Sequence, residues 1–155
     1  MIANMASVED LILNVEQEIH VRASMEDTFA ALLEQLGPGN EGGAGNPMPM
    51  KLEAWPGGRW YRDLGHNTGH LWGHVQVIKP PTLLEICGPL MMSYPAANHI
   101  QYRLKAEGGV TRLSFVHRGM GQILPDHRDG MPKGWQHWLE RIRDRAEKKK
   151  KKGQA

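Results

Sequence analysis

The feature that most constrains the fold is a strand-like segment followed by a helix-like segment near the C-terminal end. Residues 111–120 alternate, so that Leu113, Phe115 and His117 share one face of a predicted strand. Residues 134–147 instead repeat at helical spacing, and one stripe of that helix carries Trp135, Trp138, Leu139, Ile142 and Ala146. The pair predicts that an aromatic-rich helix lies across one face of a sheet.

The segments before this pair complete an α+β order. Residues 13–22 alternate like a strand, and Ser24 then stands at the N-cap of a helix that Gly37 and Pro38 end. Strand-like segments bounded by turn residues follow at 50–55, 59–64, 70–78, 82–87, 100–105 and 111–120. A run of strands bracketed by helices favours an antiparallel α+β domain over a parallel α/β sheet.

Length and charge indicate one globular domain with a separate basic end. A chain of 155 residues has the size of one domain. We expect a flexible lead-in at 1–10, a single domain at 11–147 and a disordered polylysine tail at 148–155. Five of the 19 basic residues lie at 148–152, which leaves 14 basic against 17 acidic residues elsewhere. The body is therefore slightly acidic, and a nucleic-acid-binding domain is not predicted.

No segment predicts a membrane or secretory location. The sequence has no run of about 18 apolar residues that could span a membrane. The acidic Glu9 and Asp10 stand where a signal peptide would need basic residues before an apolar stretch. Cys87 is the single cysteine and cannot form an internal disulfide. Together these features predict a cytoplasmic protein without a membrane span.

Four short motifs occur in order along the chain. They are Gly57-Gly58-x-x-Tyr61, Gly73-His74-Val75-x-x-Ile78-x-Pro80-Pro81, Thr111-Arg112-Leu113-x-Phe115-x-His117-x-Gly119 and Gly134-Trp135-x-x-x-Leu139. With them the chain resembles, from about Leu13 to Glu147, the activator-of-heat-shock-ATPase-like proteins of the SRPBCC (START, birch-pollen-allergen-like) superfamily.

The resemblance implies a helix-grip fold. In that fold a curved antiparallel sheet of about six to seven strands wraps round a long C-terminal helix, with a cavity between them. The resemblance implies no catalytic motif, because the family has no common one. Its members include lipid or polyketide binders, cyclases and chaperone cofactors. They commonly pair, so a homodimer is an expectation.

The histidines do not predict a metal site. His66, His70 and His74 follow one another at intervals of four, but the glycines among them make a helix unfavourable there. In a strand, residues four apart are separated by about 13 Å. Zinc ligands lie within about 2.0–2.1 Å of the metal, so neighbours at this spacing cannot share an ion. We expect neither a metal nor a cofactor.

His117 is the histidine predicted to face the helix. It either orients a ligand or moves a proton inside a cavity, or it is satisfied by a backbone carbonyl or a helix residue. His137 falls opposite the Trp135 stripe and is expected on the surface.

Nucleophilic catalysis has little support in the sequence. Cys87 lies at the end of an apolar strand, as a core residue would. No nucleophile-elbow serine or phosphate-binding loop occurs.

Large, adaptable side chains form the remaining candidate site, and Trp72 and Met91 belong to this collection as well as the residues given below. Small-molecule pockets are mostly apolar and aromatic, and methionine adapts its shape to a ligand. We expect Trp135 and Trp138 to form one wall of a cavity, opposite Phe115, Tyr102 and Trp60. The full expected ligand-binding set is Trp60, Met92, Tyr94, Tyr102, Phe115, His117, Met120, Trp135 and Trp138. The alternative is that these side chains fill an ordinary hydrophobic core.

Three hypotheses for function follow. The leading one is binding of a hydrophobic or aromatic small molecule between the sheet and the C-terminal helix, with His117 and Tyr94 orienting it. The loops at 37–49 and 91–94 would border the entrance. The second is a cyclase or hydratase-like activity in which His117 transfers a proton. The third is a module that assists a chaperone, which ranks last because Gln76, Gln101 and other polar residues predict a polar outer face.

Overall fold

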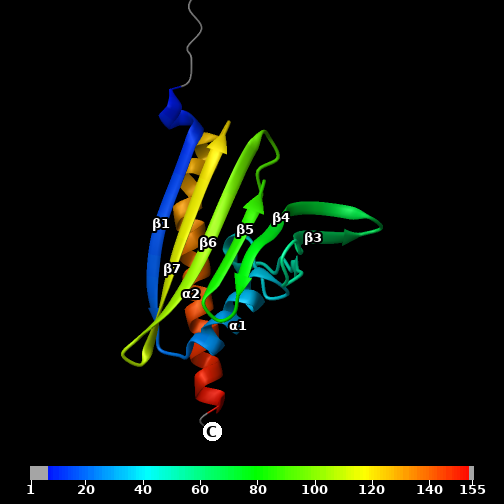
Figure 1. Ribbon diagram of the computed structural model, residues 1–155. Helices are drawn as coiled ribbons and strands as arrows, with labels where there is room; N and C mark the ends of the chain where they lie inside the picture. The colour runs from blue at the N-terminus through cyan, green and yellow to red at the C-terminus, as the bar shows by residue number, and fades with distance from the viewer. Residues whose placement is uncertain (1–6, 154–155) are drawn as a thin grey trace, which may run out of the picture.

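The structure is a computed structural model that describes residues 7–153 (Figure 1). The strands are β1 (Ile12–Val21), β2 (Lys51–Leu52), β3 (Arg59–Gly65), β4 (Thr68–Lys79), β5 (Leu83–Gly88), β6 (Ala96–Glu107) and β7 (Val110–Gly121). The helices are α1 (Met25–Leu36) and α2 (Pro125–Gly153), and short 3₁₀ turns occupy Val8–Leu11 and Gly43–Gly45. Parts of the predicted lead-in and tail, 1–6 and 154–155, lie outside the described residues.

All seven strands form one antiparallel sheet in the order β1-β7-β6-β5-β4-β3-β2. From β2 to β6, each strand pairs with the strand that follows it in the chain. Strand β1 pairs with the other edge of β7, so the first and last strands are neighbours (Figure 1). The β6–β7 register places Tyr102 opposite Phe115 and Ile100 opposite His117. The predicted antiparallel α+β fold is confirmed.

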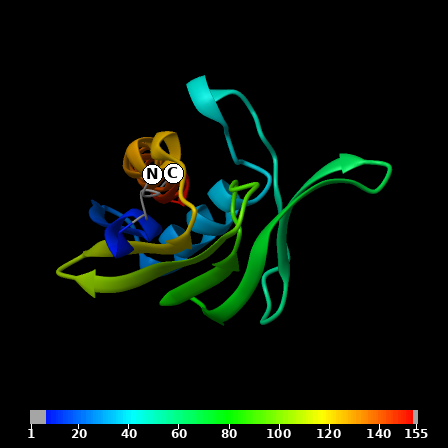
Figure 2. The ribbon, with the colours of Figure 1, turned by 90° about the horizontal axis from the view of Figure 1, so that it is seen from above.

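Both helices lie on the same side of the sheet. Figure 2 views α2 nearly end-on over one face of the long strands, while the β3–β4 hairpin projects away from the helices. The side chains that α2 buries are Met131, Trp135, Trp138, Leu139, Ile142 and Ala146. The stripe predicted from Trp135 to Ala146 is therefore the face that meets the sheet, as the helix-grip fold requires.

Helix α1 begins and ends where its sequence predicts. The Ser24 side chain accepts a hydrogen bond from the Asp27 backbone N–H at 3.0 Å, which satisfies one of the first free amides of the helix. Glu26 and Asp27 occupy the first turn, where negative charge favours the helix dipole. The helix ends at Leu36, and Gly37 follows as its C-cap.

Helix α2 begins earlier than the sequence predicts. The periodic stripe indicated a start near Gly134, because Gly130 and Pro132 both disfavour a helix interior. The structure begins α2 at Pro125. Contacts with the N-terminal part of the sheet offset that local cost: the Gln17 amide donates to the Pro132 carbonyl at 2.7 Å, and Arg128 donates to the Ile12 carbonyl at 2.6 Å.

The C-terminal end of α2 also differs from the prediction. The lysines at 148–152, expected in a disordered tail, continue the helix to Gly153. Lysine is a good helix former, and its charge suits the negative end of the helix dipole. No helix within residues 7–153 is both long and apolar enough to cross a membrane.

The strands match their predicted segments except at the sheet edge. The segment 50–55 was predicted as a strand, but only Lys51 and Leu52 pair with β3. The chain then turns, because the Trp55 amide bonds to the Glu53 carbonyl at 2.9 Å. The predicted turn between β3 and β4 is present, with His66 and Asn67 both at positive φ. Such left-handed residues suit the tight turn of a two-stranded hairpin.

Candidate functional site

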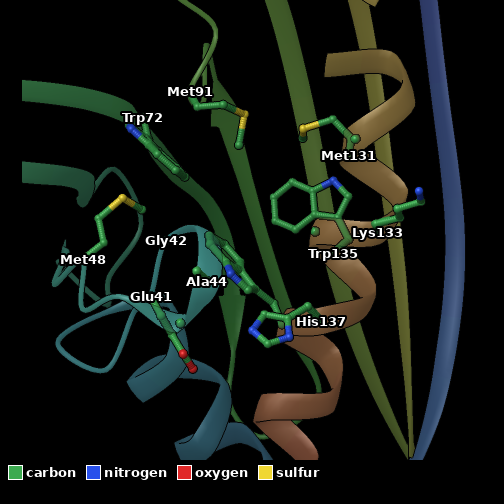
Figure 3. A pocket seen from close by; sticks show the side chains of 14 residues that line it. Glu41, Gly42, Ala44, Met48, Trp72, Met91, Met131, Lys133, Trp135 and His137 are labelled. Carbon is green, nitrogen blue, oxygen red and sulfur yellow. The ribbon is translucent and has the colours of Figure 1, made fainter. Parts of the chain in front are cut away.

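An open groove lies between α2, strand β4 and the loop after α1. It has a volume of about 720 Å³. Figure 3 shows Trp72 of β4 facing Trp135 of α2 across it, with Met91 and Met131 near one end. Its full lining is Glu41, Gly42, Ala44, Gly45, Met48, Trp72, Met91, Gly130, Met131, Lys133, Gly134, Trp135, His137 and Trp138. The loop segments predicted to border an entrance, 37–49 and 91–94, both contribute to this lining.

Two arginines of α2 hold the loop wall of the groove in place. The Arg145 guanidinium donates to the Gln35 side-chain oxygen at 2.9 Å and to the Gly39 carbonyl at 2.8 Å. One turn earlier, Arg141 Nε donates to Glu41 Oε1 at 2.6 Å. The segment after α1 is thus tied to α2 by side chains, although it has little regular structure of its own.

Beneath the groove the aromatic side chains pack against one another. The ring centroids of Trp135 and Trp138 are 5.3 Å apart, and those of Trp72 and Trp138 are 6.4 Å apart with the planes inclined by only 12°. Trp60 makes an edge-on contact with Trp72 at 5.1 Å. Such contacts between rings each add about 0.5–1.5 kcal/mol beyond burial. The groove therefore has a rigid aromatic floor.

The side chains expected to form the wall opposite the α2 tryptophans lie in the core. Trp60, Tyr102 and Phe115 are fully buried, and the Phe115 ring lies 4.8 Å from that of Trp135. Trp60 donates its indole N–H to the Leu36 carbonyl at 2.7 Å. The sheet and the helix are therefore in direct contact at these residues. The open space lies beside this contact, toward β4 and the loop.

His117 is fully buried and both of its ring nitrogens are hydrogen bonded. Trp135 donates its indole N–H to His117 Nδ1 at 3.0 Å, which makes Nδ1 the acceptor. Nε2 is therefore the protonated nitrogen of the neutral ring, and it donates to Asn98 Oδ1 at 2.7 Å. Burial lowers the pKa of His117 to about 4, so the imidazole is neutral at pH 7.

Asn98 completes this buried chain of hydrogen bonds. Its side-chain amide donates to the Pro89 carbonyl at 3.3 Å and lies 3.4 Å from the Met92 sulfur. A Cβ at position 119 would come within 2.5 Å of Asn98 Oδ1, so glycine there leaves room for the amide. The network joins α2 to the central strands. Since its groups satisfy one another, His117 has no free nitrogen for a ligand.

The other expected ligand-binding residues lie apart from the groove. Met92 is buried next to Asn98. Tyr94 contacts His127 at the start of α2, with its hydroxyl 2.6 Å from His127 Nδ1. Met120 is 64% exposed, because it follows His117 by three positions in β7 and so points to the opposite face. Of the nine expected residues, only Trp135 and Trp138 line the groove.

Several groove residues were outside the expected set. Trp72 and Met91 belonged to the wider collection of large side chains but not to the nine expected ligand-binding residues, and Met48 belonged to neither group. Met131 and His137 flank the predicted helix start. Extending the helical spacing of Trp135 backwards through Pro132 places Met131 on the same side, which is the signal that could have found it. His137 is exposed, as predicted, but its ring also borders the groove (Figure 3).

The described residues contain no cluster of three or more His, Cys, Asp or Glu side chains able to hold a metal ion. The histidines of the β3–β4 hairpin, His66, His70 and His74, are all exposed. The groove itself is lined by indoles and thioethers, together with the imidazole of His137 and the charged side chains of Glu41 and Lys133. The groove surface is therefore mainly apolar, with three polar or charged side chains among its lining.

Several solved structures share this architecture. CalU16 from Micromonospora echinospora is 17% identical, with 86% of this chain and 75% of that chain covered and a TM-score of 0.61. An uncharacterised protein from Rhizobium leguminosarum is 16% identical over 88% and 95% of the two chains, with a TM-score of 0.66. SA2116 from Staphylococcus aureus is 14% identical over 94% and 99%, also with a TM-score of 0.66. At these identities the likeness concerns the fold alone.

Sequence comparison identifies the family. A search of curated proteins found no match to the chain. The profile of the family described as activator of Hsp90 ATPase homolog 1-like protein matches residues 23–147. That range runs from just before α1 to the last buried turn of α2, and so includes every residue that lines the groove. The chain belongs to the activator of Hsp90 ATPase homolog 1-like protein family.

Proposed function

We propose that this protein binds a hydrophobic, aromatic small molecule in the groove between α2, β4 and the loop after α1. The observation that carries the proposal is an open space bounded by indoles and thioethers, which Trp72, Trp135 and Met131 exemplify. Binding sites for small organic molecules are concave, mainly apolar and about 300–1,000 Å³ in size. The groove, at about 720 Å³, is in that range.

The lining also suits a ligand of this kind energetically. Fully burying one large apolar group is worth about 1.5–3 kcal/mol. A molecule with two or three rings could therefore gain about 3–9 kcal/mol before the entropic cost of association, and a 1 μM affinity corresponds to about −8.2 kcal/mol. Because the cost of association reduces this gain, affinities of about 1 μM or weaker are expected. The three methionines, Met48, Met91 and Met131, can adjust to rings of different outline.

The enzymatic alternative has less support in the structure. It assigned a proton transfer to His117, but that imidazole donates to Asn98 and accepts from Trp135 within the core. A group that transfers a proton to a ligand must come within hydrogen-bonding distance of it. The groove lining does not include His117. Binding in the groove therefore requires no movement of His117, whereas proton transfer from His117 to a ligand would require its hydrogen bonds to break.

Position 134 offers a direct test. Gly134 lines the groove, and a Cβ added there meets no atom within 4 Å. Because the space at its Cβ is open, replacing Gly134 by Phe should place a ring in the groove, and it removes an unfavourable helical glycine. Gly134→Ala is the matched control, because it also removes the helical glycine but adds only one methyl group. Binding of Nile red, an uncharged aromatic dye, followed by fluorescence titration, should be weakened at least about tenfold in Gly134→Phe and less than about twofold in Gly134→Ala.

Native mass spectrometry of the freshly purified protein gives a second readout. A small molecule that copurifies with the wild type should be absent from Gly134→Phe and present in Gly134→Ala. Thermal unfolding should show that both variants are folded. Equal dye affinity in all three proteins would refute the proposed site.

A further inference from the structure

The groove is chemically different at its two ends. Figure 3 shows Met91, Met131 and Trp72 toward one end and Glu41 and His137 toward the other. We propose, as a refinement that rests on the proposed function, that its ligand is a neutral aromatic alcohol or phenol. The rings would lie at the methionine end and the hydroxyl group beside His137.

The first step concerns the end where the rings would lie. Met131 is buried, Met91 is half-buried, and both come from segments that pack against the aromatic floor. Trp135, whose ring faces Trp72 across this end, has already committed its N–H to His117. Lys133, a charged residue of the lining, points away from Trp72 in Figure 3. Between Trp72 and the methionines this end therefore offers apolar contact, and the Lys133 side chain points away from that space.

The second step concerns the polar end. His137 is exposed and makes no hydrogen bond or ion pair with any group in residues 7–153. Its ring nitrogens can serve as a donor and as an acceptor for a ligand. Glu41 lies at the same end with its carboxylate bonded to Arg141 at 2.6 Å. A hydroxyl group can both donate and accept one hydrogen bond, which matches an imidazole next to a carboxylate.

The third step concerns charge. The side chain of Glu41 is only 12% exposed, and Arg141 neutralises it. At the His137 end a charged head group would meet the Glu41–Arg141 ion pair, which is already balanced, while Lys133 points away from the groove. It would therefore lose its own hydration without gaining a counter-charge at this end. A neutral head group avoids this cost. The polar end thus selects a hydroxyl group over a carboxylate or an ammonium group.

The test compares three probes of one shape by isothermal titration calorimetry: naphthol, naphthalene and naphthoate. Naphthol should bind about threefold to tenfold tighter than naphthalene, as one net hydrogen bond allows. Naphthoate should bind no tighter than naphthol. In His137→Phe the affinity for naphthol should fall to that for naphthalene, whose own affinity stays within about twofold. His137→Gln keeps a donor and an acceptor and should retain most of the preference.

A spectroscopic readout reports the orientation. With isotope-labelled methionine methyl groups and histidine rings, naphthol should shift the NMR signals of Met91, Met131 and His137. Naphthalene should shift the methionine signals far more than those of His137. His70, on the exposed hairpin, is the internal control and should not move with either probe.

The outcomes separate the two claims. Equal affinity for naphthol and naphthalene, with both lost in Gly134→Phe, overturns the choice of ligand and leaves the groove as the binding site. The same holds if naphthol shifts the methionine signals but leaves those of His137 unchanged. If Gly134→Phe binds naphthol as tightly as the wild type does, or if no probe binds the wild type, the proposed function fails and the refinement fails with it.

Discussion

Acidification should destabilise this protein through one buried residue, His117. In the folded state its imidazole is held neutral between Trp135 and Asn98. Burial lowers its pKa from the ordinary 6.5 to about 4. The unfolded chain therefore takes up a proton at a higher pH than the folded protein does. The stability that His117 contributes is fully present above about pH 6.5 and is lost as the pH falls toward about 4.

The magnitude follows from the difference between the two pKa values. Each pKa unit corresponds to about 1.4 kcal/mol, so the full effect is about 3 kcal/mol, of which about 2.5 kcal/mol is lost by pH 4.5. For a domain of this size, 1 kcal/mol changes Tm by about 2–4 °C. His117 alone should thus lower Tm by about 5–10 °C between pH 7 and pH 4.5.

The assay is urea-induced unfolding at several pH values for the wild type, His117→Gln and His70→Gln. Glutamine at position 117 does not titrate, and an imperfectly matched buried amide should cost about 1–3 kcal/mol at pH 7. The stability gap between wild type and His117→Gln should therefore narrow by about 2.5 kcal/mol on going to pH 4.5. His70 is exposed, so His70→Gln should follow the wild-type profile.

A constant gap between wild type and His117→Gln across this pH range would refute the reasoning. It would mean that the folded protein protonates His117 as easily as the unfolded chain does. NMR titration of the His117 ring provides an independent check. A midpoint near pH 6.5 in the folded protein would contradict the neutral, doubly bonded imidazole.

Three further variants test how the site is held together. Trp135→Phe removes the N–H that bonds to His117 and should cost about 1–3 kcal/mol in urea unfolding, whereas a cost near zero would contradict that hydrogen bond. Gly119→Ala places a Cβ 2.5 Å from Asn98 Oδ1 and should cost about 1–3 kcal/mol, unless the amide can move without loss. Arg145→Met releases the loop wall of the groove and should speed amide hydrogen exchange there, with global stability reduced by about 1 kcal/mol; unchanged exchange would show that the loop does not depend on this side chain.

Local patterns were sufficient for most of the fold. The cap of α1 at Ser24 depends on a hydrogen bond between neighbouring residues, and the alternation in β7 depends on the two-residue repeat of any strand. The α2 stripe follows in the same way from helical periodicity. These features were predictable because each is determined within a few residues of the chain.

The start of α2 was not predictable in this way. Glycine and proline at 130 and 132 weaken a helix locally, and nothing near them in the sequence signals compensation. The compensating contacts come from Gln17, more than 100 positions away, and from the carbonyls that Arg128 reaches. A local rule fails here because long-range hydrogen bonds offset the local cost.

The candidate site was predicted only in part for a related reason. Trp135 and Phe115 both belong to periodic apolar faces, and periodicity states which way a side chain points but not whether anything fills the space in front of it. In the structure Phe115 fills that space in the core, whereas Trp135 also borders the open groove. Side chains alternate between the two faces of β7, so Met120 lies on the face opposite to His117. The prediction that Met120 binds a ligand overlooked this alternation.

The sequence by itself determined the elements, their order and the faces they bury, because these depend on periodicity and on capping between near neighbours. Only the tertiary structure decided where the interior is packed and where it is open. The open groove depends on the position of the loop after α1 relative to Trp72 and Trp135, and the hydrogen bonds of Arg141 and Arg145 fix that position. Packing is a property of side chains brought together from distant positions, and no local pattern encodes the space left between them.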